Sequence, residues 1–261
     1  MNAVYNIELL FNYKNQQNMQ SHNPILTRVE VSSDYAQPMT VQGAIRKSVL
    51  LTVIAAIVGV SLFFYTFITG NGSLAYTGAL VGAIGGFIIA LVATFKPNLA
   101  RTLAIPYALF EGAFLGGISV IFQIKFPGVP LQALLATFVT TLVMFGLYRF
   151  KIIRATEKFK SVVMSATIAI AIVFVVQFIM QMAFGSSIPF LFETSALGIG
   201  FAAFVAVIAS LNLILDFDLI ENGAAQNAPK AMEWLCAIAL LATLVWMYYS
   251  FLRLLGMLQD D

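Results

Sequence analysis

Cysteine, histidine and charged residues are scarce in this sequence of 261 residues. Cys236 is the single cysteine, which excludes an intrachain disulfide framework and a thiolate metal cage. The single histidine, His22, lies in a polar stretch that offers no further ligands, so we interpret it as solvated rather than metal-bound. Charged residues make up 10% of the chain, against about 25% in a typical soluble domain. This composition is not that of a soluble globular protein.

Hydrophobic residues are abundant in the sequence. They make up 60% of the chain, and the mean hydropathy is +0.90. A water-soluble fold cannot bury so much apolar surface, which indicates an integral membrane protein. The formal net charge of +2 is too small to indicate nucleic-acid binding, so we interpret Lys and Arg as signals of membrane topology.

Glycine, proline and charged residues divide the chain after its N-terminal tail into seven apolar segments of nearly spanning length. The segments cover residues 47–69, 73–95, 102–124, 130–149, 161–184, 189–216 and 230–258. In hydrocarbon, backbone groups must be hydrogen-bonded within a helix or a closed barrel, and these segments lack the alternation of barrel strands. The sequence therefore predicts an all-α membrane protein with seven transmembrane helices.

Polar sequence and basic residues set the expected domain limits and orientation. Residues 1–44 are predicted to be a disordered cytoplasmic tail, 45–258 the transmembrane domain and 259–261 a short acidic end. The tail lacks the apolar run of a secretory signal, and Met19 is an alternative start to Met1. Lys and Arg concentrate before the first segment and in the second, fourth and sixth loops, which places the N-terminus in the cytoplasm. With seven spans, the C-terminus then lies outside.

Glycines recur four residues apart in two neighbouring segments. Gly78, Gly82 and Gly86 lie in the second segment, and Gly112 and Gly116 lie in the third. Small residues at this spacing let helix backbones approach closely, so we predict tight packing rather than a direct functional role.

Glu111 is a carboxylate in the middle of an apolar segment. It follows Arg101 by about ten residues, or roughly 15 Å of helix, which places it near the membrane midplane. Such a carboxylate faces a cavity, has a partner or is protonated. Two interpretations follow: Glu111 lines a pore, or it is neutral and hydrogen-bonds another helix through Gln177 or Gln181.

Three acids close the predicted sixth segment, namely Asp216, Asp218 and Glu221. At a helix C-terminus they oppose the helix dipole, which makes the element a candidate proton-sensitive site. Asp216 shares a helix face with Asn212, so we assign it to the bundle interior and the other two acids to the cytoplasmic surface. The alternative is that all three are solvated loop acids.

Glu233 lies at the start of the predicted last helix, opposite the end of the sixth. Because the two helices are antiparallel neighbours, Glu233 and Asp216 could meet at one depth and share a proton, forming a pH-dependent latch. The alternative is a Glu that complements the dipole of its own helix N-terminus.

Catalytic constellations are missing from the sequence. No nucleophile is visibly paired with a base, and the Gly-x-Gly-Asp element of intramembrane aspartyl hydrolases is interrupted, because Gly198-Ile199-Gly200 is followed by Phe201. We expect no enzymatic activity and no cofactor.

Three elements carry a family resemblance over residues 45–258. They are the run Phe-Glu-Gly-Ala-Phe-Leu-Gly-Gly-Ile-Ser from Phe110, the Asp-Phe-Asp-Leu-Ile element from Asp216, and Leu-Arg-Leu-Leu-Gly ending at Gly256. With them the chain resembles the Bax inhibitor-1 (transmembrane Bax-inhibitor-motif) family in its bacterial branch. The resemblance implies six helices packed around a central C-terminal helix, a pH-sensitive calcium leak and a location in the cell inner membrane.

The resemblance also implies an aspartate pair that gates the pore, one in an Asp-Thr-Gln element and one in the last helix. Asp216 matches the first, and Asp218 stands where the element has glutamine. Thr243 stands at the second position, so either Glu233 substitutes from a different turn or the latch is absent.

Our leading hypothesis, which rests on this resemblance, is a pH-sensitive calcium or cation leak channel in the lipid bilayer. Asp216 with Glu233 closes the cytoplasmic mouth, the path passes Glu111, and Asp218 adds a further candidate cation ligand, since carboxylates suit Ca²⁺. The alternative is a non-transporting membrane regulator of stress response or membrane-protein turnover that binds a membrane protein partner.

Overall fold

A computed structural model describes residues 37–186, 188, 191 and 194–260. These residues form seven long helices and one 3₁₀ turn. Their bounds are α3 Val41–Thr69, α4 Gly72–Phe95, η1 Pro97–Leu99, α5 Ala100–Lys125, α6 Val129–Arg149, α7 Glu157–Phe184, α8 Ala196–Ala225 and α9 Met232–Gln259. All seven helices are long and apolar enough to cross a membrane, which confirms the predicted all-α fold. The predictions for most of the tail, His22 and Met19 included, fall outside the described residues.

Local sequence explains most helix ends. Thr40 caps α3, its side chain accepting a 2.9 Å hydrogen bond from the N–H of Gly43, and Thr156 and Ser195 cap α7 and α8 in the same way. Gly70 ends α3 in a left-handed conformation with φ of 65°, which a residue with a Cβ adopts only with strain. The predicted breaks therefore lie where the chain turns.

The sixth predicted segment differs most from the structure in its limits, while the first and fifth helices begin several residues before their predicted starts. The sequence predicts 189–216, whereas α8 begins at Ala196 and continues nine residues past Asp216 to Ala225. Hydropathy ends at the acids, but the backbone remains helical because the acidic side chains find partners on neighbouring helices. Asp216, Asp218 and Glu221 are helical residues, so the alternative of solvated loop acids is wrong.

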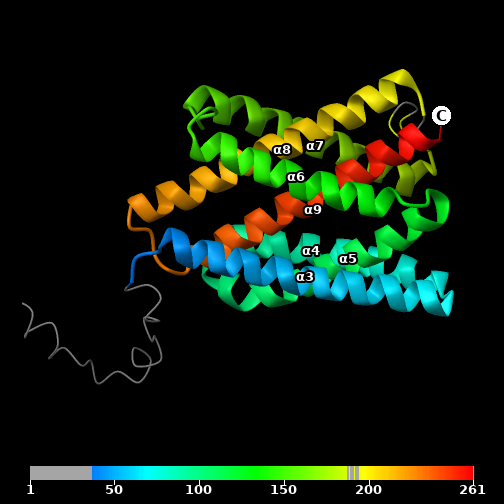
Figure 1. Ribbon diagram of the computed structural model, residues 1–261, viewed down its shortest axis with the longest axis horizontal. Helices are drawn as coiled ribbons and strands as arrows, with labels where there is room; N and C mark the ends of the chain where they lie inside the picture. The colour runs from blue at the N-terminus through cyan, green and yellow to red at the C-terminus, as the bar shows by residue number, and fades with distance from the viewer. Residues whose placement is uncertain (1–36, 187, 189–190, 192–193, 261) are drawn as a thin grey trace, which may run out of the picture.

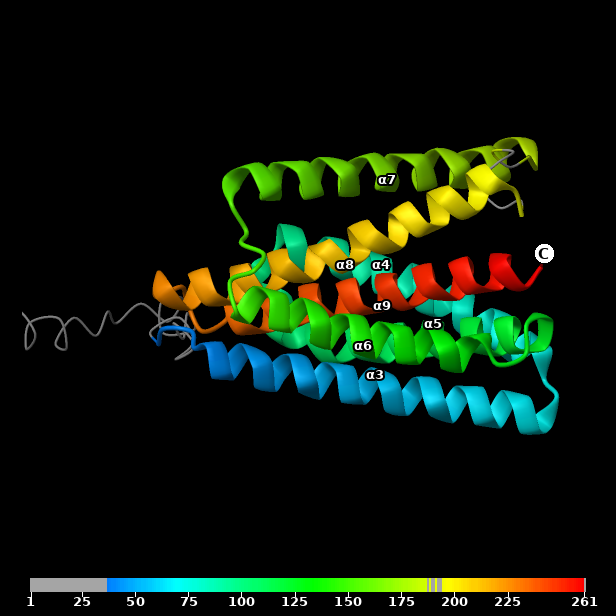
Figure 2. The same cartoon turned by 45° about the horizontal axis from the view of Figure 1, so that its top comes forward.

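Helix α9 lies at the centre of the bundle (Figure 1). It packs against α3, α4, α5, α6 and α8, whereas α7 lies on the outside and packs against α8 (Figure 2). Its buried residues face several directions, from Ile238 and Leu241 towards α3 and α5 to Leu252 towards α6. The central position implied for the last helix is confirmed.

Close backbone contacts hold α5 between α3 and α4. A Cβ at Gly82 of α4 would overlap the α5 backbone at Phe110 and Phe114, and a Cβ at Gly116 of α5 would overlap Gly59 of α3. The predicted packing role of the spaced glycines is confirmed. This contact fixes the position of Glu111 on α5.

Candidate functional site

Asp216 lies on α8 and faces α9. The hydroxyl of Thr243 donates a hydrogen bond to its carboxylate, and Oδ2 of Asp216 is buried without a hydrogen-bond partner among the described residues. The assignment of Asp216 to the bundle interior is therefore correct. Thr243, which was located by counting from the family pattern, is brought against Asp216 by the packing of α8 on α9. A buried carboxylate oxygen without a donor is costly, which makes Asp216 the least satisfied acid in this region.

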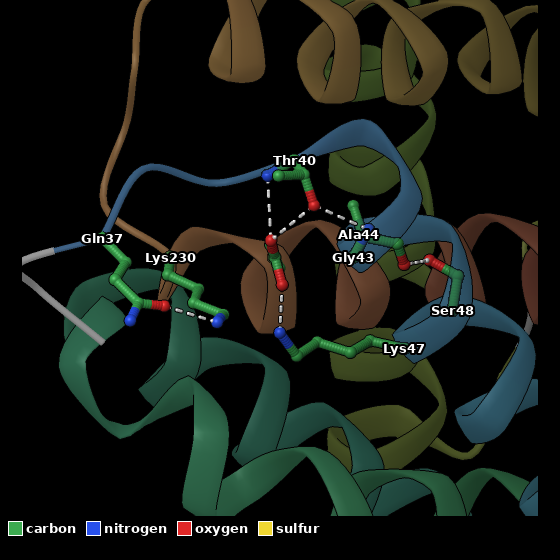
Figure 3. A network of polar contacts seen from close by, with 8 residues as sticks. Gln37, Thr40, Gly43, Ala44, Lys47, Ser48 and Lys230 are labelled. Carbon is green, nitrogen blue, oxygen red and sulfur yellow. Dashed lines mark hydrogen bonds and ion pairs between the residues drawn. The ribbon is translucent and has the colours of Figure 1, made fainter. Parts of the chain in front are cut away.

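Glu233 does not pair with Asp216. Among the described residues, its buried carboxylate accepts hydrogen bonds from the N–H of Thr40 at 2.9 Å and from the Thr40 hydroxyl at 3.2 Å, and it forms an ion pair with Lys47 (Figure 3). The predicted Asp216–Glu233 latch is thus replaced by a contact between α9 and the start of α3. Because the Lys47 ammonium neutralises its carboxylate, Glu233 is not available as a cation ligand in this structure.

Helix lengths explain why the latch prediction fails. Because α8 continues nine residues past Asp216, this residue lies about 14 Å from the end of its helix. Thr243 lies eleven residues into α9, about 16 Å from its start, and so reaches the depth of Asp216. Glu233 is the second residue of α9 and lies roughly 15 Å from Thr243 along the helix.

Glu111 lies eleven residues into α5, at a depth similar to that of Asp216. The hydroxyl of Tyr107, one turn earlier, donates a hydrogen bond to its carboxylate. The carboxylate rests against α4, since a Cβ at Gly86 would lie 2.7 Å from Oε1 of Glu111. Gln177, an expected partner, instead accepts a 2.7 Å hydrogen bond from the N–H of Ile188. Among the residues that the structure describes, Glu111 is therefore partnered on its own helix rather than by another helix.

The remaining acids of α8 lie near the α6–α7 connection. Asp218 forms a 2.8 Å ion pair with Lys160 and accepts a 2.7 Å hydrogen bond from Asn222. Glu221 is exposed and accepts a 2.5 Å hydrogen bond from the hydroxyl of Tyr148. The surface position predicted for Glu221 is confirmed, whereas Asp218 is half-buried with 17% of its side chain exposed.

The acids do not gather into a metal centre. In the part of the chain that the structure describes, no three Asp, Glu, His or Cys side chains lie close enough to hold a metal ion together. Asp216 and Glu111 lie at a similar depth on α8 and α5, both of which pack against α9. The bundle therefore contains separate carboxylates rather than a group of acids that could surround a metal ion.

Sequence reasoning missed three partners of the acids. Tyr107 could have been found, because it precedes Glu111 by four residues and so shares its helix face. Thr40 and Lys47 could not, because nothing local links them to Glu233, from which Lys47 is 186 residues distant in sequence. Cys236 is buried beside Met39, where it packs as a small hydrophobic side chain.

Comparison with known proteins identifies one family. The family model described as Bax inhibitor 1 like matches residues 2–260. No match is found among curated proteins or among solved structures.

Proposed function

This chain belongs to the Bax inhibitor 1-like family, and on that premise we propose that it conducts cations, Ca²⁺ foremost, passively across the membrane in a pH-dependent manner. The observation that carries the proposal is the Asp216 carboxylate, which is held inside the bundle with one buried oxygen unpartnered among the described residues. An intramembrane acid of this kind is a functional residue by default, because it is costly to insert.

The ligand chemistry at Asp216 suits an ion in passage. Ca²⁺ takes six to eight oxygen ligands in a resident site. Asp216 and the hydroxyl of Thr243 offer few oxygens, and no group of three acids surrounds them among the described residues. Such a site attracts a divalent cation without retaining it, as conduction requires. We propose no catalysed reaction.

The orientation we propose places the N-terminus in the cytoplasm and the protein in the cell inner membrane. The beginning of α3 and the α6–α7 and α8–α9 connections lie at one end of the bundle, and the C-terminus at the other (Figure 2). Lys and Arg gather at the first end, as expected for the cytoplasmic side: Arg46, Lys47, Arg149, Lys151, Arg154, Lys158, Lys160 and Lys230.

A reporter fused after Asp261 tests this orientation. We expect alkaline phosphatase fused there to be active and green fluorescent protein to be dark, because the C-terminus would lie outside the cytoplasm. The same reporters fused after Phe150, in the α6–α7 connection, serve as the cytoplasmic control. Fluorescence from the C-terminal fusion would contradict the orientation.

Reconstitution tests the proposed transport. Purified protein in liposomes loaded with a Ca²⁺ indicator is expected to admit external Ca²⁺ down its gradient without an energy source, and to do so at a rate that changes with pH. Empty liposomes and liposomes with another seven-helix protein are the controls. Folded protein that admits no cation would contradict the proposal and favour the membrane-regulator alternative.

Glu111→Gln tests whether the path passes α5. We expect Ca²⁺ entry to fall by roughly threefold. A carboxylate on α5 attracts a cation held at Asp216 less strongly than a direct ligand does, because the attraction falls with distance. Tyr107→Phe is the matched control, since it removes the hydroxyl bound to Glu111 and keeps the charge. If Ca²⁺ entry fell in Tyr107→Phe but not in Glu111→Gln, Glu111 would not lie on the path.

A further inference from the structure

We propose that residues 37–40, the N-terminal strap, hold the cytoplasmic end of the α8–α9 hairpin against α3 and thereby keep the cation path closed. The inference rests on the proposed function and adds its regulation. Three independent sets of contacts support it, namely a backbone pairing, an apolar anchor and an ion pair.

The backbone of the strap pairs with the α8–α9 connection. The N–H of Met39 donates to the carbonyl of Ala228 at 2.8 Å, and the N–H of Lys230 donates to the carbonyl of Gln37 at 2.9 Å. Between these bonds Pro38 faces Pro229 in an antiparallel bridge. Pro38 and Pro229 form a non-hydrogen-bonded pair, in which neither residue donates an N–H to the other strand. Proline, which has no N–H, therefore fits at both positions.

Met39 anchors the strap in the bundle. Its side chain is 3% exposed and packs with Ile220 of α8 and Cys236 of α9. The sulfur also lies over Gly223, where an added Cβ would come within 2.7 Å of it. The anchor therefore sits between the two helices that carry Asp216 and Thr243, one turn from Asp216 along α8.

The ion pair fastens the strap and α3 to α9. Glu233 is 1% exposed; its carboxylate accepts two hydrogen bonds from Thr40 and forms an ion pair with Lys47 (Figure 3). Lys47 also lies 5.1 Å from the ring centre of Trp234. Gly43 has no side chain at the point where the Glu233 carboxylate approaches α3, and a Cβ there would overlap it.

These contacts oppose separation of the α8–α9 hairpin from α3 at this end. Opening the end would strip the partners from the buried Glu233 carboxylate and expose Met39, so all three sets of contacts must break together. With the strap in place, Met39 packs on Ile220, which lies one helical turn beyond Asp216 on α8. Lifting the strap uncovers that turn.

A disulfide across the strap tests the inference. Pro38→Cys and Pro229→Cys, combined in a Cys236→Ala background, place two thiols at directly opposed positions of an antiparallel pair, where side chains are close enough to be bridged. In liposomes, oxidation is expected to lower Ca²⁺ entry at least fivefold and reductant to restore it. The two single-cysteine variants in the same background control for oxidation itself, and mass spectrometry measures the bridge.

A releasing variant makes the opposite change. Met39→Ala removes the apolar anchor and is expected to raise Ca²⁺ entry about threefold. Met182→Ala is the matched control, because Met182 lies on α7 and is 80% exposed. A folded Met39→Ala protein that conducts no faster than the Met182→Ala protein would count against the strap as a closing element.

The outcomes separate this inference from the proposed function. A bridged protein that conducts as fast as its reduced form would overturn the strap and leave the channel intact. A failure of the two thiols to bridge under oxidant would overturn the strap pairing itself. A background protein that carries no Ca²⁺ under any condition would defeat the proposed function, and the regulation with it.

Discussion

Asp216→Asn is expected to lower Ca²⁺ entry about tenfold and to flatten its dependence on pH. A unit charge 4 Å from a second one contributes about 4 kcal/mol at an effective dielectric constant near 20. The attraction for a divalent cation is about twice as large, and losing about a sixth of it, about 1.4 kcal/mol, corresponds to a tenfold lower rate. Asparagine keeps the shape of the side chain and its hydrogen bond with Thr243, so the change isolates the charge.

The measurement compares initial Ca²⁺ entry into liposomes over a range of pH. Wild-type entry should approach the Asp216→Asn rate as the pH falls, because asparagine resembles the protonated acid. Glu157→Gln, which neutralises an acid whose side chain is 91% exposed, is the matched control and should keep both the rate and the pH response. If Asp216→Asn conducted at the wild-type rate and kept the pH response, Asp216 would not be the group that meets the cation.

Thr243→Val gives the second half of this test. Removing the hydroxyl deprives the Asp216 carboxylate of the hydrogen bond it has on α9 and leaves the charge in place. We expect entry to fall by less than it does in Asp216→Asn, while the pH response remains. A Thr243→Val protein that lost its pH response would assign proton sensing to the pair rather than to Asp216.

Hydropathy was sufficient to locate the membrane helices because burial in lipid follows average composition. It failed at α8 because the last part of that helix is held by specific partners, among them Lys160 for Asp218 and Tyr148 for Glu221. Those partners come from α7 and α6. Hydropathy averaged over a window of sequence contains no information about contacts with other helices.

The site shows the same division between local and distant causes. The interior position of Asp216 follows from its helix face, whereas its neighbour Thr243 is indicated only by the family resemblance. The partner of Glu233 depends on how the start of α3 docks on α9, which no local pattern encodes. The predicted latch assumed that α8 ended at Asp216, and the extra nine residues of helix separate the two acids in depth.

Gly82→Ala is expected to destabilise the folded bundle by about 1–3 kcal/mol, the usual cost of overpacking a close contact. The new Cβ would lie 2.6 Å from the carbonyl oxygen of Phe110 and 2.8 Å from Cα of Phe114, and both atoms are backbone that cannot rotate away. Helix α4 would have to move outward from α5 and take Gly86 away from Glu111.

Thermal unfolding in detergent, followed by the fluorescence of the two tryptophans, measures the effect of Gly82→Ala. Its melting temperature should fall by several degrees, on the order of 2–4 °C per kcal/mol for a domain of this size. Gly146→Ala on α6 is the matched control, because a Cβ there meets nothing within 4 Å and alanine favours the helix. An equal fall in both variants would show that helix flexibility, rather than the α4–α5 contact, is the property that glycine supplies. If only Gly82→Ala lost stability and its Ca²⁺ entry also changed, the α4–α5 contact would be shown to position Glu111 as well as to hold the bundle together.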